Sequence, residues 1–227
     1  MKAFVLRRYG RQHALEPADL PLPELRDDEV LVQVHAAGVN LLDAKIRSGE
    51  FKPILPYRLP LVLGHDVAGV VVQRGPRVRQ FQLGDEVYAR LDDGRIGGFA
   101  EFAPVRESSL ALKPRGISME EAASLPLVAL TAWQALVDRA GLQAGQKVFI
   151  QAGSGGVGTV ALQLAKHLGA QVATTAGSSN LALVKGLGAD VAVDYRAQDF
   201  EAVLQDYDVV LHSQDGRTLD KSLRVLK

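Results

Sequence analysis

Hydrophobic positions follow two different patterns along the chain. From Met1 to about Pro114 the apolar runs are short, rich in Val and Leu, and separated by Gly, Pro and Asp. Such runs predict strands joined by turns. We expect a mainly β region whose clearest strands are Val30–Val34, Leu61–Leu63, Val67–Val72, Glu86–Ala89 and Phe99–Pro104, with one short helix at Leu42–Arg47.

The pattern changes at Ser118. The sequence Ser118-Met119-Glu120-Glu121 is a capping box, and an Ala- and Leu-rich helical stretch follows it. From Lys147 onward strands alternate with helices, which predicts a parallel sheet covered by helices. The strands are expected at Val148–Gln151, Val172–Thr175, Val191–Asp194 and Val209–Leu211, and the helices at Gly156–Leu168, Leu181–Leu187, Phe200–Gln205 and Leu219–Leu226. We therefore predict an α/β protein of two domains, residues 1–117 and 118–227.

A glycine-rich turn joins the first of these parallel strands to its helix. The run Gln151-Ala152-Gly153-Ser154-Gly155-Gly156-Val157-Gly158 contains the pattern G-x-G-x-x-G, which is typical of dinucleotide-binding turns at this junction. Gly153 is expected to permit the tight turn, Gly155 to let backbone amides reach a pyrophosphate, and Gly158 to bring helix and strand together. The helix N-terminus would add partial positive charge. The alternative is a strand-to-helix turn that merely needs glycines.

The choice of dinucleotide depends on the residues that follow the next strand. An acidic side chain there would accept the ribose 2′-hydroxyl of NAD. This chain has Thr174-Thr175-Ala176-Gly177-Ser178-Ser179-Asn180, without a carboxylate, so the sequence favours NADP. Ser178 and Ser179 are candidate phosphate donors, although either could simply cap the next helix. Lys185 and Arg196 are the nearest cations in sequence.

Composition narrows the possible partners. Of 227 residues, 47% are hydrophobic, enough for a sizeable core, and 26 Lys plus Arg balance 26 Asp plus Glu. This balance disfavours nucleic acid and anionic membranes as partners. The partner that we expect is a small-molecule substrate. No apolar run approaches a membrane span or a secretory signal, so we expect a cytoplasmic protein. The absence of cysteine excludes disulfides, thiolate metal ligands and thiol nucleophiles.

Several ordered motifs resemble the medium-chain dehydrogenase/reductase superfamily, specifically its zinc-independent quinone oxidoreductase branch. The resemblance covers nearly the whole chain. Its motifs are Ala36-Ala37-Gly38-Val39-Asn40 with Asp43 and Arg47-Ser48-Gly49, then Leu63-Gly64-His65-Asp66-Val67-Ala68-Gly69, Gly84-Asp85-Glu86-Val87-Tyr88, Ala122-Ala123-Ser124-Leu125-Pro126, Leu130-Thr131-Ala132-Trp133, and the glycine turn.

The resemblance implies a GroES-like β domain that carries much of the catalytic site, followed by a partial Rossmann domain for NADP. By resemblance, Asn40 would lie beside the nicotinamide and donate to the substrate oxygen, and Asp43 would orient neighbouring groups. Thr131 would contact the nicotinamide, and Tyr195 would lie near the 2′-phosphate. Asn40 and Asp43 are also ordinary helix-cap residues, and the Thr131 hydroxyl could bond within its own helix.

The chain departs from the pattern of this family at several positions. Zinc-dependent relatives would carry cysteine at Asn40, so the usual zinc ligands are absent and His65 is expected to be a hydrogen-bonded turn residue. The other histidines, His13, His35, His167 and His212, form no ligand-spaced cluster. By resemblance, Lys45 replaces a frequent tyrosine, and Leu181 replaces a lysine that binds the 2′-phosphate.

These observations favour an NADPH-dependent reductase of quinones or α,β-unsaturated carbonyls, because without a Lewis acid the hydride acceptor must already be electrophilic. The alternatives are a catalytically silent NADPH-binding protein and, less favoured, a zinc alcohol dehydrogenase. The family would continue beyond Lys227 with further strands and a return segment, so we expect a C-terminally truncated chain with an unpaired sheet edge. A homodimer is possible.

Overall fold

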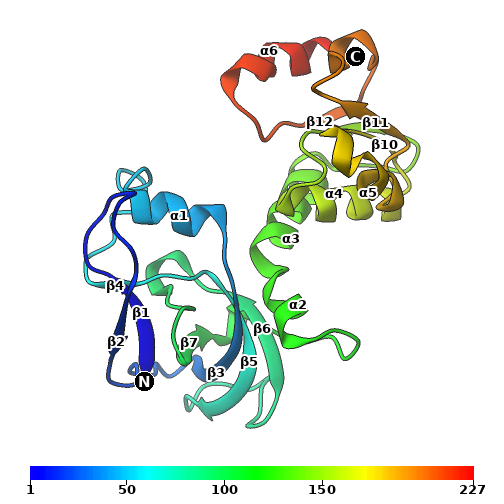
Figure 1. The fold of residues 1–227 in the computed structure, drawn as a ribbon. Helices are drawn as coiled ribbons and strands as arrows, with labels where there is room; N and C mark the ends of the chain where they lie inside the picture. Colours follow the sequence, from blue (N-terminus) through cyan, green and yellow to red (C-terminus); the bar gives the residue numbers. More distant parts are fainter. The chain divides into compact units, whose positions relative to one another are not determined.

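A computed structural model describes residues 1–227. The chain forms two compact units, Met1–Leu127 (unit 1) and Val128–Lys227 (unit 2) (Figure 1). The helix α2 (Met119–Ala123) lies in unit 1, where its Ala122 and Ala123 pack against Ala68. This contact extends unit 1 past residue 117, and the functional division between residues 117 and 118 stays a prediction.

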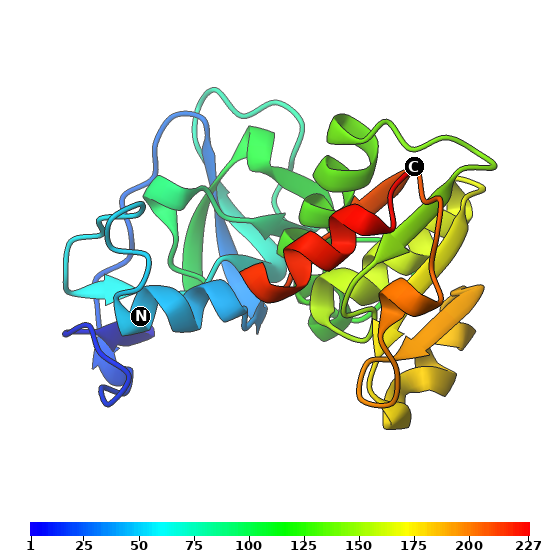
Figure 2. The ribbon, with the colours of Figure 1, turned by 90° about the horizontal axis from the view of Figure 1, so that it is seen from above.

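Unit 1 is built from two antiparallel sheets with strand orders β2-β1-β4 and β7-β3-β5-β6-β8. Figure 2 shows β1 and β2 side by side at one end of this unit. Its elements are β1 (Lys2–Leu6), β2 (Glu16–Asp19), β3 (Glu29–Gly38), α1 (Leu41–Ser48), β4 (Leu61–Val62), β5 (Asp66–Arg74), β6 (Glu86–Arg90), β7 (Phe102–Arg106), β8 (Leu110–Leu112) and α2.

The strands predicted as clearest are all present, with shifted ends. β3 continues four residues past Val34, because a bulge between Val34 and Ala36 lets its far half stay paired with β5. β7 begins only at Phe102, because the Phe99 carbonyl accepts the Phe4 amide of β1 instead. β1, β2 and β8 were not predicted, and β2 has the sequence Glu-Pro-Ala-Asp, which carries no apolar alternation.

Unit 2 contains a parallel sheet of order β11-β10-β9-β12. In chain order this is 3-2-1-4, the order of a Rossmann half. Helices α4 and α5 lie on one side of the sheet and α6 on the other (Figure 1). The elements are α3 (Pro126–Trp133), whose first two residues belong to unit 1, a π-helical segment Gln134–Arg139, β9 (Lys147–Ile150), α4 (Gly156–His167), β10 (Gln171–Ala176), α5 (Leu181–Gly186), β11 (Val191–Asp194), β12 (Val209–Leu211) and α6 (Gly216–Arg224).

Alternating side chains of β9 give unit 2 a core on each face of its sheet. Val148 and Ile150 pack with Leu162 and Ala165 of α4 on one face, whereas Phe149 packs on the other with Phe200 and Tyr207, its ring centroid 4.9 Å and 6.2 Å from theirs.

The predicted helix Phe200–Gln205 is wrong. Only a 3-10 turn forms there, at Phe200–Ala202, because Asp206 adopts a left-handed φ of 59° that turns the chain into β12. Each helix is either too short or too polar to be a candidate membrane span.

Candidate functional site

Asn40, which is half-buried, and the buried Asp43 belong to one polar network in unit 1. Asn40 is the N-cap of α1, and its backbone amide donates to Asp43 Oδ2 at 2.8 Å, which closes one half of a capping box. The Asn40 carboxamide instead donates from Nδ2 to Asp66 Oδ2 at 3.0 Å. The structure therefore brings the two candidate catalytic residues together and adds Asp66 to them.

Asp43 also holds His65 at the entry to β5. His65 Nδ1 lies 2.7 Å from Asp43 Oδ1, and the Gly64 amide donates to the same oxygen at 3.2 Å. Because the carboxylate can only accept, Nδ1 carries the proton. Both residues are at most 3% exposed, and His65 Nε2 is buried without a partner. His65 is hydrogen-bonded, as expected, and it lies fully buried at a bend directly before β5.

Asp66 is the second buried carboxylate of this network. Its oxygens accept the Leu127 backbone amide at 3.0 Å and 3.1 Å, an amide in the first turn of α3 that has no helical acceptor. Burial raises the pKa of Asp66 to about 6, against the lowering effect of the hydrogen bonds from Asn40 and Leu127. This carboxyl group therefore changes charge close to neutral pH.

Two glycines in the recognised motifs make this arrangement possible. Gly64 has a φ of +103° and aims the following residues, His65 and Asp66, at Asp43 and Asn40. A Cβ at Gly38 would lie 2.4 Å from the Ala123 carbonyl, so only glycine lets β3 approach α2. The motif glycines thus position the polar side chains that come after them.

The glycine turn of unit 2 is formed by close backbone approaches. A Cβ at Gly158 would lie 2.3 Å from the Ala152 carbonyl oxygen, and one at Gly153 would lie 2.2 Å from Thr174 Oγ1. The left-handed residue of the turn is Ala152, with φ 53°, so the tight turn assigned to Gly153 falls one residue earlier. Gly155 is the N-cap of α4 and makes no side-chain cap, which leaves the first amides of the helix open to a ligand.

The loop after β10 lies against this turn. The Ala152 amide donates to Thr175 Oγ1 at 3.1 Å, and Asn180 Nδ2 donates to Ser154 Oγ at 3.3 Å. Ser178 and Ser179 are both exposed next to them. Ser178 Oγ donates to the Asp194 carboxylate, a residue that the sequence pattern did not single out.

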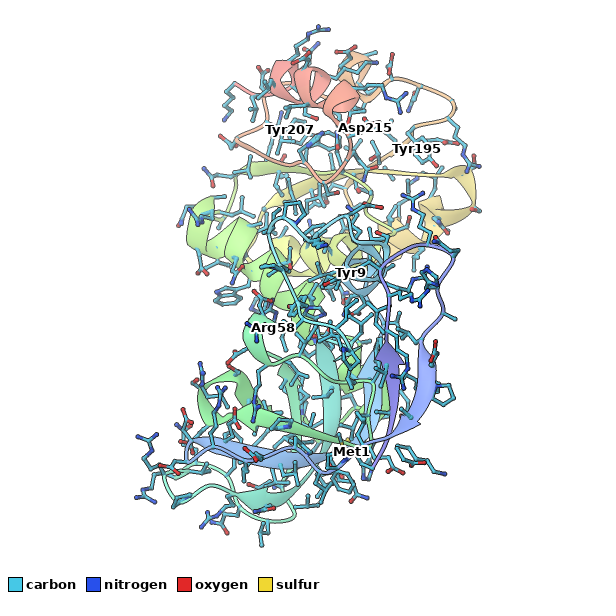
Figure 3. The ribbon with its side chains drawn as sticks, turned by 90° about the vertical axis from the view of Figure 1, so that its left-hand side faces the viewer. Met1, Tyr9, Arg58, Tyr195, Tyr207 and Asp215 are labelled. Atoms are coloured by element: carbon cyan, nitrogen blue, oxygen red, sulfur yellow. The ribbon has the colours of Figure 1, made fainter.

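Tyr195 and Thr131 complete the predicted cofactor residues. Tyr195 directly follows β11 and is 57% exposed at the edge of unit 2 (Figure 3). A Cβ at Gly177 would lie 3.8 Å from its ring, so Tyr195 borders the loop after β10. Thr131 is exposed on α3, whose residue Val128 would lie 3.2 Å from a Cβ at Gly156. The predicted cofactor residues of unit 2 thus gather around the glycine turn or flank it.

A groove of about 940 Å³ lies elsewhere in unit 1. It runs between β1, β2 and the far half of β3, and its lining does not include Asn40 or Asp43.

Sequence reasoning missed His65 and Asp66 as partners of the candidate catalytic residues, although both stand in the motif Leu63-Gly64-His65-Asp66. No cluster of three His, Cys, Asp or Glu side chains is placed to hold a metal ion.

An antiparallel β unit and a parallel sheet in Rossmann order with a glycine turn define a protein of the dinucleotide-binding dehydrogenase class. Two family models match the chain. One, described as "Alcohol dehydrogenase GroES-like domain", matches residues 26–115, and the other, "Zinc-binding dehydrogenase", matches residues 156–227. The chain belongs to the medium-chain dehydrogenase/reductase superfamily, among its quinone-oxidoreductase-like members. The predicted fold class is confirmed.

Individual relatives have reductase names. The chain is 42% identical to the "NADPH-dependent alkenal/one oxidoreductase, chloroplastic" of Arabidopsis thaliana, over 100% of this chain and 60% of that protein. The quinone oxidoreductase structure from Coxiella burnetii is similar with a TM-score of 0.93, at 36% identity over 100% of this chain and 73% of that one. The Escherichia coli quinone oxidoreductase complexed with NADPH has a TM-score of 0.88, at 27% identity over 100% and 70%. The chain spans about 60% of the length of curated relatives such as the Arabidopsis thaliana enzyme.

Proposed function

We propose that this protein is an NADPH-dependent, zinc-independent oxidoreductase that transfers hydride to a quinone or an α,β-unsaturated carbonyl. The observation that carries the proposal is the glycine turn, where Gly153 and Gly158 have no room for a side chain and the N-terminus of α4 is uncapped. The names of the similar alkenal and quinone oxidoreductases support the choice of substrate class.

The cofactor site that we propose lies in unit 2. The open amides at the start of α4, those of Gly156, Val157 and Gly158, would hold the pyrophosphate together with Gly153, Ser154 and Gly155. Ser178, Ser179 and Tyr195 would face the adenosine ribose, and Thr131 the nicotinamide. When bound, NADPH supplies the hydride.

The substrate oxygen needs a hydrogen-bond donor, because negative charge develops on it as hydride arrives at the conjugated carbon. We propose Asn40 as that donor. Its Nδ2 carries two hydrogens, and only one of them is committed to Asp66. Asp66 thereby fixes the orientation of the amide, and Asp43 is a positioning residue that holds the Asn40 backbone and His65.

The donor set of the chain agrees with a zinc-free reaction. A medium-chain zinc site would need thiolate ligands, and the sequence has no cysteine. His65 is the one zinc-ligand residue of the family pattern that this chain keeps, and its Nδ1 is hydrogen-bonded to Asp43. We further propose that residues 1–117 carry the catalytic residues, that residues 118–227 hold the cofactor, and that the substrate is a small molecule. A cytoplasmic location and a homodimer stay predictions.

Steady-state kinetics with the purified protein test the proposal. NADPH absorbance should fall steadily with a quinone or an enone as acceptor, much more slowly with NADH, and not with a saturated ketone. Asn40→Ala should lower kcat about a hundredfold if its amide stabilises the developing charge, with little change in NADPH affinity. NADPH binding without turnover would instead indicate a catalytically silent binding protein, and no cofactor binding would overturn the proposal.

A further inference from the structure

A carboxylate reaches the proposed ribose site from an unexpected strand. The sequence pattern for cofactor choice concerns the end of the second strand, β10, and finds no acidic residue there. In the structure the end of the third strand, β11, lies directly beside it, with Asp194 paired in register with Ala176. A side chain on β11 can therefore face the same ligand atoms as one on β10.

Asp194 is directed at the loop after β10. One of its oxygens accepts the Ser178 hydroxyl, and the other accepts the Arg196 backbone amide at 3.0 Å. These two hydrogen bonds lower the pKa of the Asp194 carboxyl, so it is negatively charged at neutral pH. Ser178, a proposed 2′-phosphate donor, is thus already bonded to an anion.

A cation, Arg196, borders the same loop as this carboxylate. The Arg196 guanidinium lies over the Tyr195 ring, 5.6 Å from its centroid. A Cβ at Gly177 would be 3.9 Å from Arg196 Cζ, so the guanidinium borders the same loop. Lys185, the other cation considered from the sequence, forms part of the last turn of α5.

We propose that Asp194 and Arg196 act against each other to set the preference of this chain between NADPH and NADH. Arg196 pairs with the 2′-phosphate of NADPH, and Asp194 accepts the free ribose 2′-hydroxyl of NADH and repels the phosphate. The inference rests on the proposed function, because it concerns the adenosine end of the same cofactor site. It makes β11 and the residues that follow it, rather than β10, the source of cofactor selectivity.

The mechanism follows from the charges alone. A phosphate dianion beside an ionised Asp194 is repelled, and the Ser178 hydroxyl must leave Asp194 before it can donate to the phosphate. Arg196 offsets that repulsion through charge-assisted hydrogen bonds. Because these groups are exposed, salt weakens both the repulsion by Asp194 and the attraction by Arg196.

Binding measurements on the purified protein test this inference without relying on turnover. Dissociation constants for NADPH and NADH are measured by calorimetry for the wild type, Asp194→Asn and Arg196→Gln. Asp194→Asn should strengthen NADPH binding about tenfold and weaken NADH binding, since the repulsion is removed and the charged acceptor of the 2′-hydroxyl is replaced by a weaker, neutral one. Arg196→Gln should weaken NADPH binding about tenfold and leave NADH binding unchanged.

Two matched variants control for net charge. Asp220→Asn and Lys185→Gln change the same charges at exposed positions elsewhere in unit 2 and should leave the ratio of the two dissociation constants unchanged. A ratio that stays within about twofold of the wild type in Asp194→Asn, or an equal loss of both cofactors in Arg196→Gln, overturns the inference while the proposed function stands. A wild type that binds neither cofactor overturns both.

Discussion

The two candidate regions are built by opposite means. In unit 1 the residues around Asn40 form a network of buried side chains, in which Asp43, His65 and Asp66 satisfy one another and nearby backbone amides. In unit 2 the glycine turn works through missing side chains, since Gly153 and Gly158 leave no space for a Cβ and Gly155 leaves the helix amides uncapped. The first region depends on electrostatics within the protein and the second on steric fit.

This difference means that each region should fail in its own way. A buried network is costly to break because the partners left behind stay desolvated and unpaired. A close backbone approach is costly to fill because the backbone, unlike a flexible side chain, cannot move aside. Substitutions that break the network in unit 1 and substitutions that add a side chain to the glycine turn can therefore test the electrostatic and the steric explanation separately.

The largest effect is expected for Asp43→Ala. It removes the acceptor of three donors, namely His65 Nδ1, the Gly64 amide and the Asn40 amide, of which the first two are buried from water. We expect a loss of about 3–5 kcal/mol in the free energy of unfolding, measured by urea denaturation. Asp27→Ala, at an exposed ion pair with Arg77, is the control and should change it by at most about 0.5 kcal/mol. If Asp43→Ala and Asp27→Ala destabilised the protein equally, the buried network would contribute no more to stability than an exposed ion pair.

A smaller loss is expected for Gly158→Ala. Its Cβ would lie 2.3 Å from the Ala152 oxygen and 2.7 Å from Gly153 Cα, so the turn and α4 must separate. We expect about 3 kcal/mol of destabilisation and loss of NADPH binding. Gly186→Ala in α5 is the matched control: no atom lies within 4 Å of its Cβ, and it should be neutral or stabilising by up to about 1 kcal/mol. Normal NADPH binding by Gly158→Ala would contradict the steric explanation.

The same contrast explains what could be predicted from the sequence. The glycine turn is local, with strand, turn and helix consecutive in the chain, and β9, α4 and β11 lie within about one residue of their predicted bounds. The network in unit 1 joins Asn40 to Asp66 and Asp66 to Leu127, contacts that depend on strand register and on how α2 packs. The pairing of Asp194 with Ser178 was missed for the same reason, since it crosses between neighbouring parallel strands.

A third prediction concerns pH and the network alone. The folded pKa of Asp66 is raised from 3.8 to about 6 by burial, so between these values the folded state holds a proton that the unfolded state has lost. The contribution of Asp66 is therefore fully present below about pH 4 and is lost as the pH rises through about 6, a change of about 2–3 kcal/mol. Asp66→Asn should remove it.

The measurement is the difference between the urea unfolding free energies of wild type and Asp66→Asn at several pH values from 4 to 7. Other carboxyl groups cancel in this difference, including Glu29, whose pKa is lowered by Arg95 and Arg26 despite its burial and whose contribution therefore has the opposite sign. If the difference did not vary with pH, the folded-state pKa of Asp66 would not be raised. The glycine turn has no titrating group in this window and predicts no such dependence.

The smallest effects are expected at the N-termini of the two helices that flank these regions. Ser118 caps α2, with its Oγ accepting the Glu121 amide at 3.2 Å, whereas Gly155 leaves α4 uncapped. Ser118→Ala should cost about 1 kcal/mol in stability without changing NADPH affinity. Gly155→Ser should gain a few tenths of a kcal/mol by capping α4, yet weaken NADPH binding by about threefold to tenfold, because its hydroxyl takes an amide meant for the phosphate. If Gly155→Ser left the affinity unchanged, the open amides of α4 would not be part of the cofactor site, and the contrast between a capped structural helix and an uncapped binding helix would be lost.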